Sequence, residues 1–325
     1  MKIVMKKSAK MQLRRSVLRW ISIASFTFLL LLFPSENIYF QQVLHNDPLV
    51  IPESVPLPSP PSYPIKNTKE PPPTLSAGAI LVKDISSGVV LYEVSSDASF
   101  PPASTAKMMT AIVALDHFQL DDILTVPTFK GDGRSMGLFP GEKLTFESLL
   151  YGALVHSAND AAITIAENFP GGSEKFVEIM NEKGKEFHLA NTRFTNPVGY
   201  DDEKQNTTAK DLTKLAIIGL SNKTFRKIVS TRNITVSDIT YTHFYPLSNV
   251  NELLGKVPGM SGVKTGFTEN AGEILISEVQ KNDHNVLFVI LRSKDRFGET
   301  MKLVDWVFGN FTWVPVTEII PAIQG

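Results

Sequence analysis

Ser104 and Lys107, a serine and a lysine three positions apart, are the residues whose types and spacing most directly suggest chemistry. If Ser104 opens a helix, Lys107 lies about one turn further along the same face, so the hydroxyl and the amine can touch. A serine becomes a nucleophile when a base takes its proton, and lysine acts as that base only when neutral. Because free lysine titrates near about 10.4, burial or nearby positive charge must lower its pKa by about 3. The spacing therefore indicates a nucleophile and its base.

The same stretch also fits an ordinary helix start. Ser104 could be a capping residue, with Lys107 on a solvated face. A second pair with the same spacing, Ser261 and Lys264, shows that the pattern can arise by chance in a chain of 325 residues. The pair alone leaves both interpretations open.

Two further polar sets stand where predicted elements meet, which is where active sites are commonly built. Ser157 and Asn159 lie between two predicted helices, and Lys264-Thr265-Gly266 lies on a predicted strand. Each set has a plainer explanation, because the first could cap helices and the second could be an edge strand with its lysine in solvent. All three sets in this order would arise by chance far less often than any one of them alone.

The overall composition excludes several other kinds of site. The chain is 43% hydrophobic with a formal net charge of -1, which fits a globular protein and gives no indication of nucleic acid binding. It has no cysteine, which excludes disulfides, thiolate metal sites and cysteine nucleophiles. Its six histidines are scattered, with no pair at the spacing of a helical zinc site. We therefore expect no metal and no cofactor.

Residues 1–36 combine a basic start with an apolar run, the pattern of an export signal. Seven Lys and Arg residues precede or border an uncharged apolar stretch of 14 residues at 20–33. The positive-inside rule predicts that the remaining chain lies outside the cytoplasm, in the periplasm or on the outer face of the membrane. The stretch is short for a spanning helix, but Pro34-Ser35-Glu36-Asn37 offers no small-x-small cleavage site. We expect a membrane anchor over residues 17–33, with a cleaved signal peptide as the alternative.

The rest of the chain divides by composition into three parts. Residues 37–74 include ten prolines and predict a semi-rigid linker that is partly polyproline II. Residues 75–312 carry the periodic patterns of a folded catalytic domain, and residues 313–325 form a tail without an assignment.

Within residues 75–312, two groups of predicted strands flank a group of predicted helices. The helices are expected to start near Ser104, Thr145, Ser173 and Thr208, with a last one over 297–308. The strands are expected at 77–85, 89–94, 234–236, 261–266, 272–279 and 286–291, with a turn at Asn282-Asp283. Because the helices cluster instead of alternating with strands, we predict an α+β domain with both strand groups in one sheet.

Taken together, the three sets resemble the motifs Ser-x-x-Lys, Ser-x-Asn and Lys-Thr-Gly of the serine-type D-alanyl-D-alanine carboxypeptidases. These are the low-molecular-weight penicillin-binding proteins of the penicillin-binding protein and β-lactamase superfamily. The resemblance covers about residues 77–308 and includes Ser135-Met136-Gly137-Leu138, Asn159-Asp160-Ala161-Ala162 and Thr195-Asn196-Pro197. It implies a β-lactamase/transpeptidase-like fold, in which a helical cluster faces an antiparallel sheet across the active site.

The resemblance also implies catalytic roles. Ser104 is expected to attack the carbonyl between two D-alanines at the end of a peptidoglycan stem peptide, and Lys107 to take its proton. Ser157 is expected to relay a proton to the leaving amine, and Asn159 to hold the substrate backbone. A water would then release the acyl-enzyme.

Substrate-binding roles follow from the same resemblance. Lys264 is expected to add positive potential, and Thr265 to bind the terminal carboxylate. The strand that continues through Gly266 is expected to hold the peptide extended, with the N–H groups of Phe267 and of the serine as the oxyanion hole. Arg296 is expected near the carboxylate site. β-Lactam antibiotics are the expected covalent inhibitors.

The chain also departs from the family pattern. Val198-Gly199-Tyr200 stands where many members have His-Gly-Leu, and the β-rich second domain and amphipathic C-terminal anchor of many relatives are not found, so we expect the N-terminal anchor to replace them. Endopeptidase action on cross-links remains an alternative, because the same residues cut both bonds. A β-lactamase remains another, although the second motif is Ser-Ala-Asn instead of Ser-Asp-Asn. A non-catalytic peptidoglycan-binding module is the third, although all three motifs are complete.

Overall fold

The computed structural model describes residues 16–29, 62–129 and 131–315, in two compact units whose boundary falls between residues 59 and 60. In the first unit, residues 16–29 form a helix whose side chains are exposed. Among the residues described, no helix is both long and apolar enough to cross a membrane. The predicted anchor continues to residue 33 and the predicted linker begins at residue 37, so residues 30–33 and most of the linker lie outside the described part.

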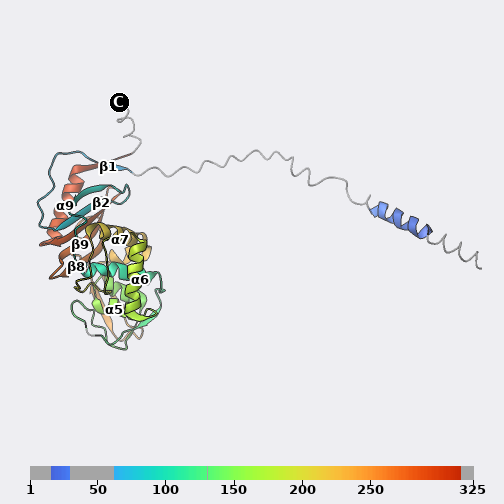
Figure 1. The fold of residues 1–325 in the computed structure, drawn as a ribbon, viewed down its shortest axis with the longest axis horizontal. Helices are drawn as coiled ribbons and strands as arrows, with labels where there is room; N and C mark the ends of the chain where they lie inside the picture. Colours follow the sequence, from blue (N-terminus) through green and yellow to red (C-terminus); the bar gives the residue numbers. More distant parts are fainter. Residues whose placement is uncertain (1–15, 30–61, 130, 316–325) are drawn as a thin grey trace, which may run out of the picture. The chain divides into compact units, whose positions relative to one another are not determined.

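The second unit is organised around a five-stranded antiparallel sheet (Figure 1). Its strand order is β3 (Val90–Val94), β2 (Ala79–Asp84), β10 (His284–Ser293), β9 (Gly272–Lys281) and β8 (Met260–Thr268). The first two strands come from the start of the domain and the last three from its end. The prediction that both strand groups join in one sheet is therefore confirmed.

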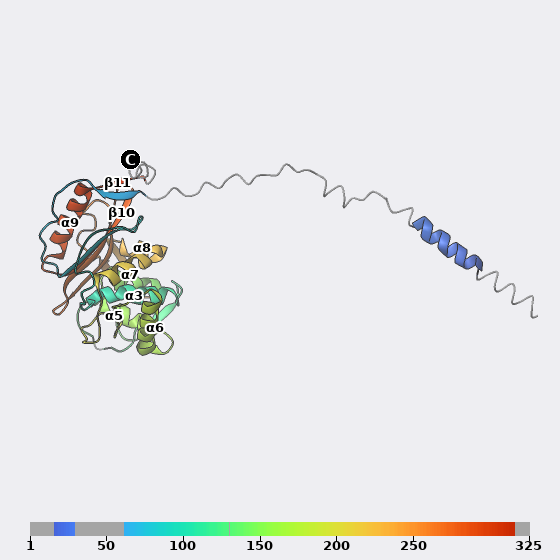
Figure 2. The same ribbon diagram turned by 45° about the horizontal axis from the view of Figure 1, so that its top comes forward.

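Both faces of this sheet are covered, which explains why its central strands are apolar almost throughout. On β9, Ile274 and Ile276 pack into the core shared with the helical cluster. Leu275 and Val279 point the other way and pack with α9 (Arg296–Asn310). The view in Figure 2 shows α9 on one side of the sheet and α3, α5, α6, α7 and α8 on the other.

The helical cluster lies between β3 and β8 in the sequence. It consists of a 3-10 turn and six helices: η1 (Ala103–Ala106), α3 (Lys107–Leu115), α4 (Phe146–Leu154), α5 (Asn159–Glu167), α6 (Gly172–Glu186), α7 (Ala209–Ser221) and α8 (Lys223–Val229). The caps expected at Thr145 and Thr208 are confirmed, since each side chain accepts the backbone N–H three residues on. The cap expected at Ser173 is wrong, because α6 begins at Gly172 and its cap is Gly171, two residues earlier, whose φ of 92° favours glycine.

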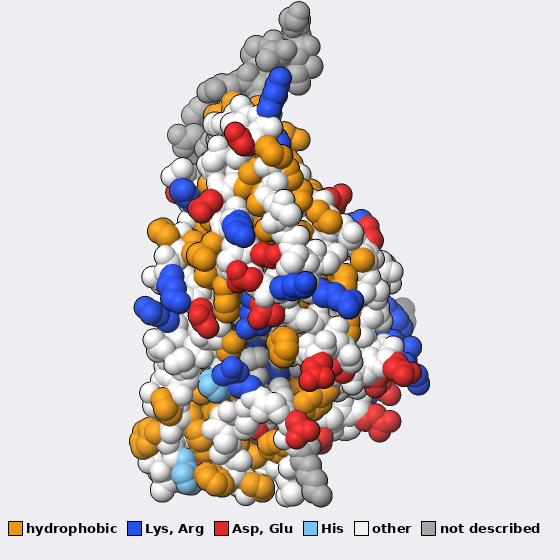
Figure 3. Space-filling model, turned by 90° about the vertical axis from the view of Figure 1, so that its left-hand side faces the viewer, with side chains coloured by type: hydrophobic (Ala, Val, Ile, Leu, Met, Phe, Trp, Pro, Cys, Tyr) orange, Lys and Arg blue, Asp and Glu red, His pale blue; other side chains and the backbone are white. Residues whose placement is uncertain are grey.

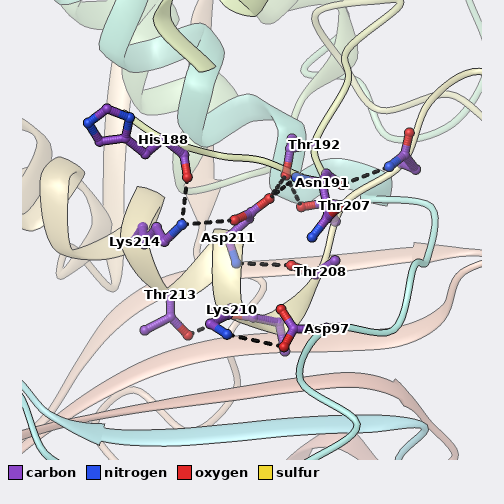
Figure 4. A network of polar contacts seen from close by, with 12 residues as sticks. Asp97, His188, Asn191, Thr192, Thr207, Thr208, Lys210, Asp211, Thr213 and Lys214 are labelled. Atoms are coloured by element: carbon purple, nitrogen blue, oxygen red, sulfur yellow. Dashed lines mark hydrogen bonds and ion pairs between the residues drawn. The ribbon is translucent and has the colours of Figure 1, made fainter. Parts of the chain in front are cut away.

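The start of α7 anchors the loop before it through a buried carboxylate, Asp211 (Figure 4). One oxygen of Asp211 accepts the Asn191 N–H at 2.8 Å and the Thr192 hydroxyl at 2.9 Å. The other accepts the Lys214 amine at 3.3 Å. Both carboxylate oxygens that burial has removed from water thus find a donor, as a stable core requires. These four residues, Asn191, Thr192, Asp211 and Lys214, are called the Asp211 network.

Three two-stranded sheets complete the fold: β1 (Tyr63–Lys66) with β11 (Phe311–Val314), β4 (Ile123–Thr125) with β5 (Lys143–Thr145), and β6 (Asn233–Ser237) with β7 (Phe244–Ser248). The first pair departs from the prediction, because β1 lies within the range assigned to the linker. Its partner β11 is fixed to the main sheet by the Trp313 indole, which donates to the buried Asp84 carboxylate at 2.9 Å. The folded unit therefore includes residues that composition alone assigns to the linker and the tail.

Candidate active site

A cavity of about 370 Å3 lies between β8 and the helical cluster. Seven of the nine residues predicted from the motifs line it: Ser104, Ser157, Asn159, Thr265, Gly266, Phe267 and Arg296. The other two, Lys107 and Lys264, lie buried behind it with their amines on the two serine hydroxyls. Figure 3 shows Lys and Arg side chains inside a hollow near the middle of one face of the molecule. The structure thus brings all the predicted residues to one place.

Ser104 lies in the 3-10 turn η1, and the α-helix proper begins with Lys107. The prediction that Ser104 opens the α-helix is therefore wrong in detail. The tighter turn keeps the two side chains adjacent, and Lys107 Nζ lies 3.0 Å from Ser104 Oγ. Residue 103, before the serine, has a φ of 47°, so the turn is entered through an unfavourable backbone conformation that its surroundings must hold.

Lys107 is fully buried, and no carboxylate of the described residues bonds its amine. Burial lowers its pKa to about 7, although the negative charge of Asp160 partly opposes this shift. A neutral amine has two N–H groups and one lone pair. It can donate to the Val198 carbonyl at 2.9 Å and still direct the lone pair at the Ser104 hydroxyl. Lys107 can therefore act as a base near neutral pH.

The second serine and lysine form a similar pair on the opposite wall. Lys264 Nζ lies 2.7 Å from Ser157 Oγ and donates to the Thr265 carbonyl at 3.1 Å. Burial holds the pKa of Lys264 well below its usual range, and the positive charges of Lys107, Arg296 and Arg134 lower it further. Ser157 itself has a φ of 61°, an unusual conformation that is typical of functional sites. This pair can pass a proton between its amine and a group in the cavity.

Asp160, in the first turn of α5, holds this wall in place, and no role was predicted for it from the sequence. Its buried carboxylate accepts the backbone N–H groups of residues 136, 137, 138 and 161 and the hydroxyl of Ser135, at 2.6 to 3.1 Å. Negative charge is also favourable at a helix N-terminus. Asp160 therefore ties the loop at 135–138 to the helix that carries Asn159. The signals for it in the sequence are its place directly after the Ser-x-Asn motif and its inclusion in the family-like stretch Asn159-Asp160-Ala161-Ala162.

The loop at 196–200 supports the serine from the other side. Gly199 has a φ of 90°, and a Cβ there would lie 1.7 Å from the Ala103 carbonyl oxygen, so only glycine fits. The Asn196 side chain accepts the N–H groups of Val198, Gly199 and Tyr200. This network fixes the Val198 carbonyl that holds Lys107. The sequence marked Val198-Gly199-Tyr200 as a departure from the family pattern but did not indicate the contact of this loop with the serine turn.

β8 is the last strand of the main sheet, so one of its edges is free to pair with an extended peptide. Gly266 lies close to the serine turn, because a Cβ there would be 3.1 Å from that of Ala103. Its carbonyl accepts the Arg296 guanidinium at 2.9 Å. Arg296 also keeps one buried N–H, at Nε, without a partner among the described residues. This strand edge therefore combines free backbone groups with a nearby cation.

Comparisons with known proteins agree with this geometry. The profile of a family described as D-alanyl-D-alanine carboxypeptidase matches residues 66–295. D-alanyl-D-alanine carboxypeptidase DacF of Bacillus subtilis is 33% identical over 240 residues, which cover 70% of this chain and 61% of DacF. The chain thus spans less than two thirds of that relative. A D-alanyl-D-alanine endopeptidase of Escherichia coli is 32% identical over 258 residues, which cover 77% of this chain and 80% of the endopeptidase.

A solved structure shows the same fold. Penicillin-binding protein D2 from Listeria monocytogenes, in its ampicillin-bound form, is similar with a TM-score of 0.66 and 28% sequence identity. The match covers 73% of this chain and 100% of that chain. The predicted penicillin-binding-protein fold is therefore confirmed.

Proposed function

The chain belongs to the serine-type D-alanyl-D-alanine carboxypeptidase family, and on this premise we propose that it removes the terminal D-alanine from peptidoglycan stem peptides. The reaction would proceed through an acyl-enzyme at Ser104. The observation that carries the proposal is the 3.0 Å contact between the Ser104 hydroxyl and the fully buried Lys107 amine, whose pKa is lowered to about 7. Such a pair is the minimum that a serine needs to attack a carbonyl.

In the first step, Lys107 takes the proton of Ser104 as the serine oxygen bonds to the carbonyl carbon between the two D-alanines. The carbonyl oxygen becomes negative and is stabilised by the backbone N–H groups of Ser104 and Phe267. Two features support this arrangement. Phe267 lies on β8, whose neighbouring residue Gly266 packs against the serine turn, and both residues line the cavity with the serine.

In the second step, the bond between the carbonyl carbon and the leaving nitrogen breaks, and that nitrogen receives, through Lys264 and Ser157, the proton that Lys107 took from Ser104, so that Lys107 is neutral again. The 2.7 Å contact from Lys264 to Ser157 provides the route. Thr265 and Arg296 would hold the terminal carboxylate of the departing D-alanine. Water, deprotonated by Lys107, then attacks the ester at Ser104 and releases the shortened peptide.

Endopeptidase activity is the second candidate, since one similar protein is named D-alanyl-D-alanine endopeptidase. Hydrolysis of a cross-link would use the same four catalytic residues, Ser104, Lys107, Ser157 and Asn159, and would differ in the amine that leaves. β-Lactams would acylate Ser104 because they present a carbonyl in the place of the substrate, and the ampicillin-bound relative supports this part of the proposal.

We also propose an extracytoplasmic location with attachment to the membrane. Support comes from the basic residues at 2–19 and from the apolar side chains exposed on the helix at 16–29. The segments 1–36, 37–74, 75–312 and 313–325 would then serve as anchor, linker, catalytic domain and tail. The pairing of β1 with β11 adds residues 63–66 to the folded part.

The test uses the full-length protein, purified in detergent, and a peptide that ends in D-Ala-D-Ala. Release of free D-alanine by the wild type, and none by Ser104→Ala, is the expected result. No release by the wild type, or equal release by Ser104→Ala, would overturn the proposal. A cross-linked dimer of stem peptides, assayed in parallel, would show whether endopeptidase action is faster.

Intact-mass analysis after treatment with penicillin separates the remaining alternatives. A stable adduct on the wild type, absent from Ser104→Ala, is expected of a penicillin-binding protein. An adduct that turns over within seconds would favour a β-lactamase instead. A protein that binds peptidoglycan, forms no adduct and releases no D-alanine would be a binding module.

A further inference from the structure

Tyr200, which is outside the motifs, lines the cavity together with Asn159 and residues 132–134 of a neighbouring loop. Its hydroxyl donates to the Asp132 carbonyl at 2.9 Å. The Asn159 amide nitrogen donates to the same carbonyl at 2.6 Å and lies 3.4 Å from the Tyr200 hydroxyl. The three groups therefore form a closed triangle, in which Asp132 accepts twice and Tyr200 both donates and accepts.

Two glycines let the loop come this close. A Cβ at Gly131 would lie 2.9 Å from the Tyr200 hydroxyl, and a Cβ at Gly133 would lie 2.9 Å from the Asn159 amide nitrogen. Gly133 also has a φ of 86°. Any larger residue at either position would push the loop away from one corner of the triangle. The absence of a Cβ at Gly131 and Gly133 thus permits the close approach of the loop to Tyr200 and Asn159.

The triangle uses both N–H groups of the Asn159 amide, but unequally. The bond to Asp132, at 2.6 Å, is short, whereas 3.4 Å to Tyr200 is beyond the usual range for a hydrogen bond of this type. The N–H that faces Tyr200 can therefore be given up at little cost. An incoming peptide carbonyl can take it over while the bond to Asp132 keeps the amide oriented.

Tyr200 also connects this corner to the serine. Its backbone N–H and carbonyl are both held by Asn196, and its carbonyl also accepts from Gln205. The preceding residues of the same loop contact Lys107 and the serine turn. Burial raises the pKa of the Tyr200 hydroxyl, so it stays protonated and remains a donor at neutral pH.

We propose that Tyr200 is a positioning residue for substrate binding: by holding the Asp132 carbonyl in place, it keeps one Asn159 N–H directed at the backbone carbonyl of the acyl-donor peptide. This rests on the proposed function, in which Asn159 holds that backbone. Tyr200 acts through Asn159 and takes no part in proton transfer.

The test compares four full-length variants with the wild type by kcat/KM for release of D-alanine from a peptide ending in D-Ala-D-Ala. They are Tyr200→Phe, Asn159→Ala, the double variant, and Tyr241→Phe as the matched control. Tyr241 is 73% exposed and its hydroxyl makes no hydrogen bond within the described residues, so losing it should change nothing. Thermal unfolding of each variant, and labelling by penicillin run to completion, report that the fold and Ser104 are intact.

Tyr200→Phe should lower kcat/KM about 3- to 10-fold, as loss of one hydrogen bond predicts. In the Asn159→Ala background the same change should have less than about a 2-fold effect, because the group through which it acts is gone. An equal fold loss in both backgrounds would overturn the proposal and show a structural role independent of Asn159. No loss in either background would overturn it as well.

Failure of this proposal can be told from failure of the proposed function. A wild type that neither releases D-alanine nor forms a penicillin adduct contradicts the function itself. An active wild type whose Tyr200→Phe variant is equally active contradicts only the role of Tyr200.

Discussion

The domain contains two buried polar networks that hold their charges in opposite ways. In the Asp211 network, a buried carboxylate receives two neutral donors and the amine of Lys214, so its charge is compensated (Figure 4). At the active site, the buried amines of Lys107 and Lys264 bond, within the described part of the chain, only hydroxyl and carbonyl oxygens. The partners of Asp211 stabilise its negative charge. The partners of Lys107 and Lys264 do not compensate the positive charge of a protonated amine, so the neutral amine, which can accept a proton, is favoured.

The comparison shows that burial alone does not make a reactive group. Asp211 and Lys107 are both nearly or fully inaccessible to solvent. The two residues differ in their partners. The amine of Lys214 compensates the charge of Asp211, whereas the Lys107 amine has a hydroxyl and a carbonyl oxygen as its partners. Substitutions in the two networks should therefore separate loss of activity from loss of stability.

The largest expected effect is that of Lys107→Met, which keeps most of the side-chain volume and removes the base. Without the amine, Ser104 has no group to take its proton, so kcat/KM should fall about 10³-fold. Lys214→Met is the matched control, since it removes an amine from the Asp211 network. D-alanine release is the measurement, and thermal unfolding checks the fold. Activity of Lys107→Met within tenfold of the wild type would show that Lys107 is not the base.

The next largest effect is expected at Gly199, where the loop at 196–200 touches the serine turn. In Gly199→Ala, the new Cβ cannot remain 1.7 Å from the Ala103 oxygen, so the loop must move and take the Val198 carbonyl away from Lys107. A displacement on this scale should lower kcat/KM about 10²-fold.

Gly88→Ala provides the control for backbone strain. Gly88 also has a positive φ, of 75°, but a Cβ there meets no atom within 4 Å. Both variants should lose some stability because alanine disfavours this conformation. Only Gly199→Ala should lose activity, and equal activity losses in the two variants would contradict the role of the loop.

The pH dependence of acylation tests the state of the amine directly. Lys107 works as a base in its neutral form, and its pKa is lowered to about 7. Below pH 7 the neutral fraction falls about tenfold for each pH unit, so the rate of acylation by penicillin should fall by the same factor. Above pH 7 it should level off. Intact-mass measurements between pH 5 and 9 supply the rates, and a flat profile from pH 5 to 7 would argue against a lysine base.

Much of this site was predictable because its chemistry is concentrated in short motifs. The local sequence is enough to identify the three motif sets, the strand that carries Lys264 and Thr265, and the caps at Thr145 and Thr208. The interpretation of Ser104 as a nucleophile depends on the other motifs, since its own surroundings fit a helix cap equally well.

The parts that could not be predicted depend on contacts between distant segments. β1 pairs with β11 across about 245 positions, and no local pattern in a proline-rich stretch indicates such a partner. Asp160 bonds the backbone of the loop at 135–138, and Gly199 lies against the backbone of Ala103. Only the folded chain brings these segments together. The 3-10 turn at Ser104 is likewise set by packing against β8 and the loop at 196–200, not by the propensity of its residues.

The smallest expected effect on activity is that of Asp211→Asn. The substitution keeps the shape of the side chain but removes the charge that binds Lys214 and strengthens the bonds from Asn191 and Thr192. Because hydrogen bonds to a buried charge are worth about 1.5–3 kcal/mol, the free energy of unfolding should fall by about 2 kcal/mol in urea titrations. Activity of the folded protein should stay within about 2-fold of the wild type, since none of the four residues of this network lines the cavity.

The control for Asp211→Asn is Asp97→Asn, a change in a neighbouring ion pair with Lys210 that is drawn in the same view (Figure 4). Asp97 and Lys210 are both more than half exposed, so water and salt already screen their attraction. Its loss should leave the unfolding midpoint almost unchanged. If Asp211→Asn were equally neutral, burial would not be what makes the Asp211 network stabilising. If Asp211→Asn lowered kcat/KM as strongly as Gly199→Ala, the claim that the Asp211 network stabilises the fold without contributing to activity would be wrong.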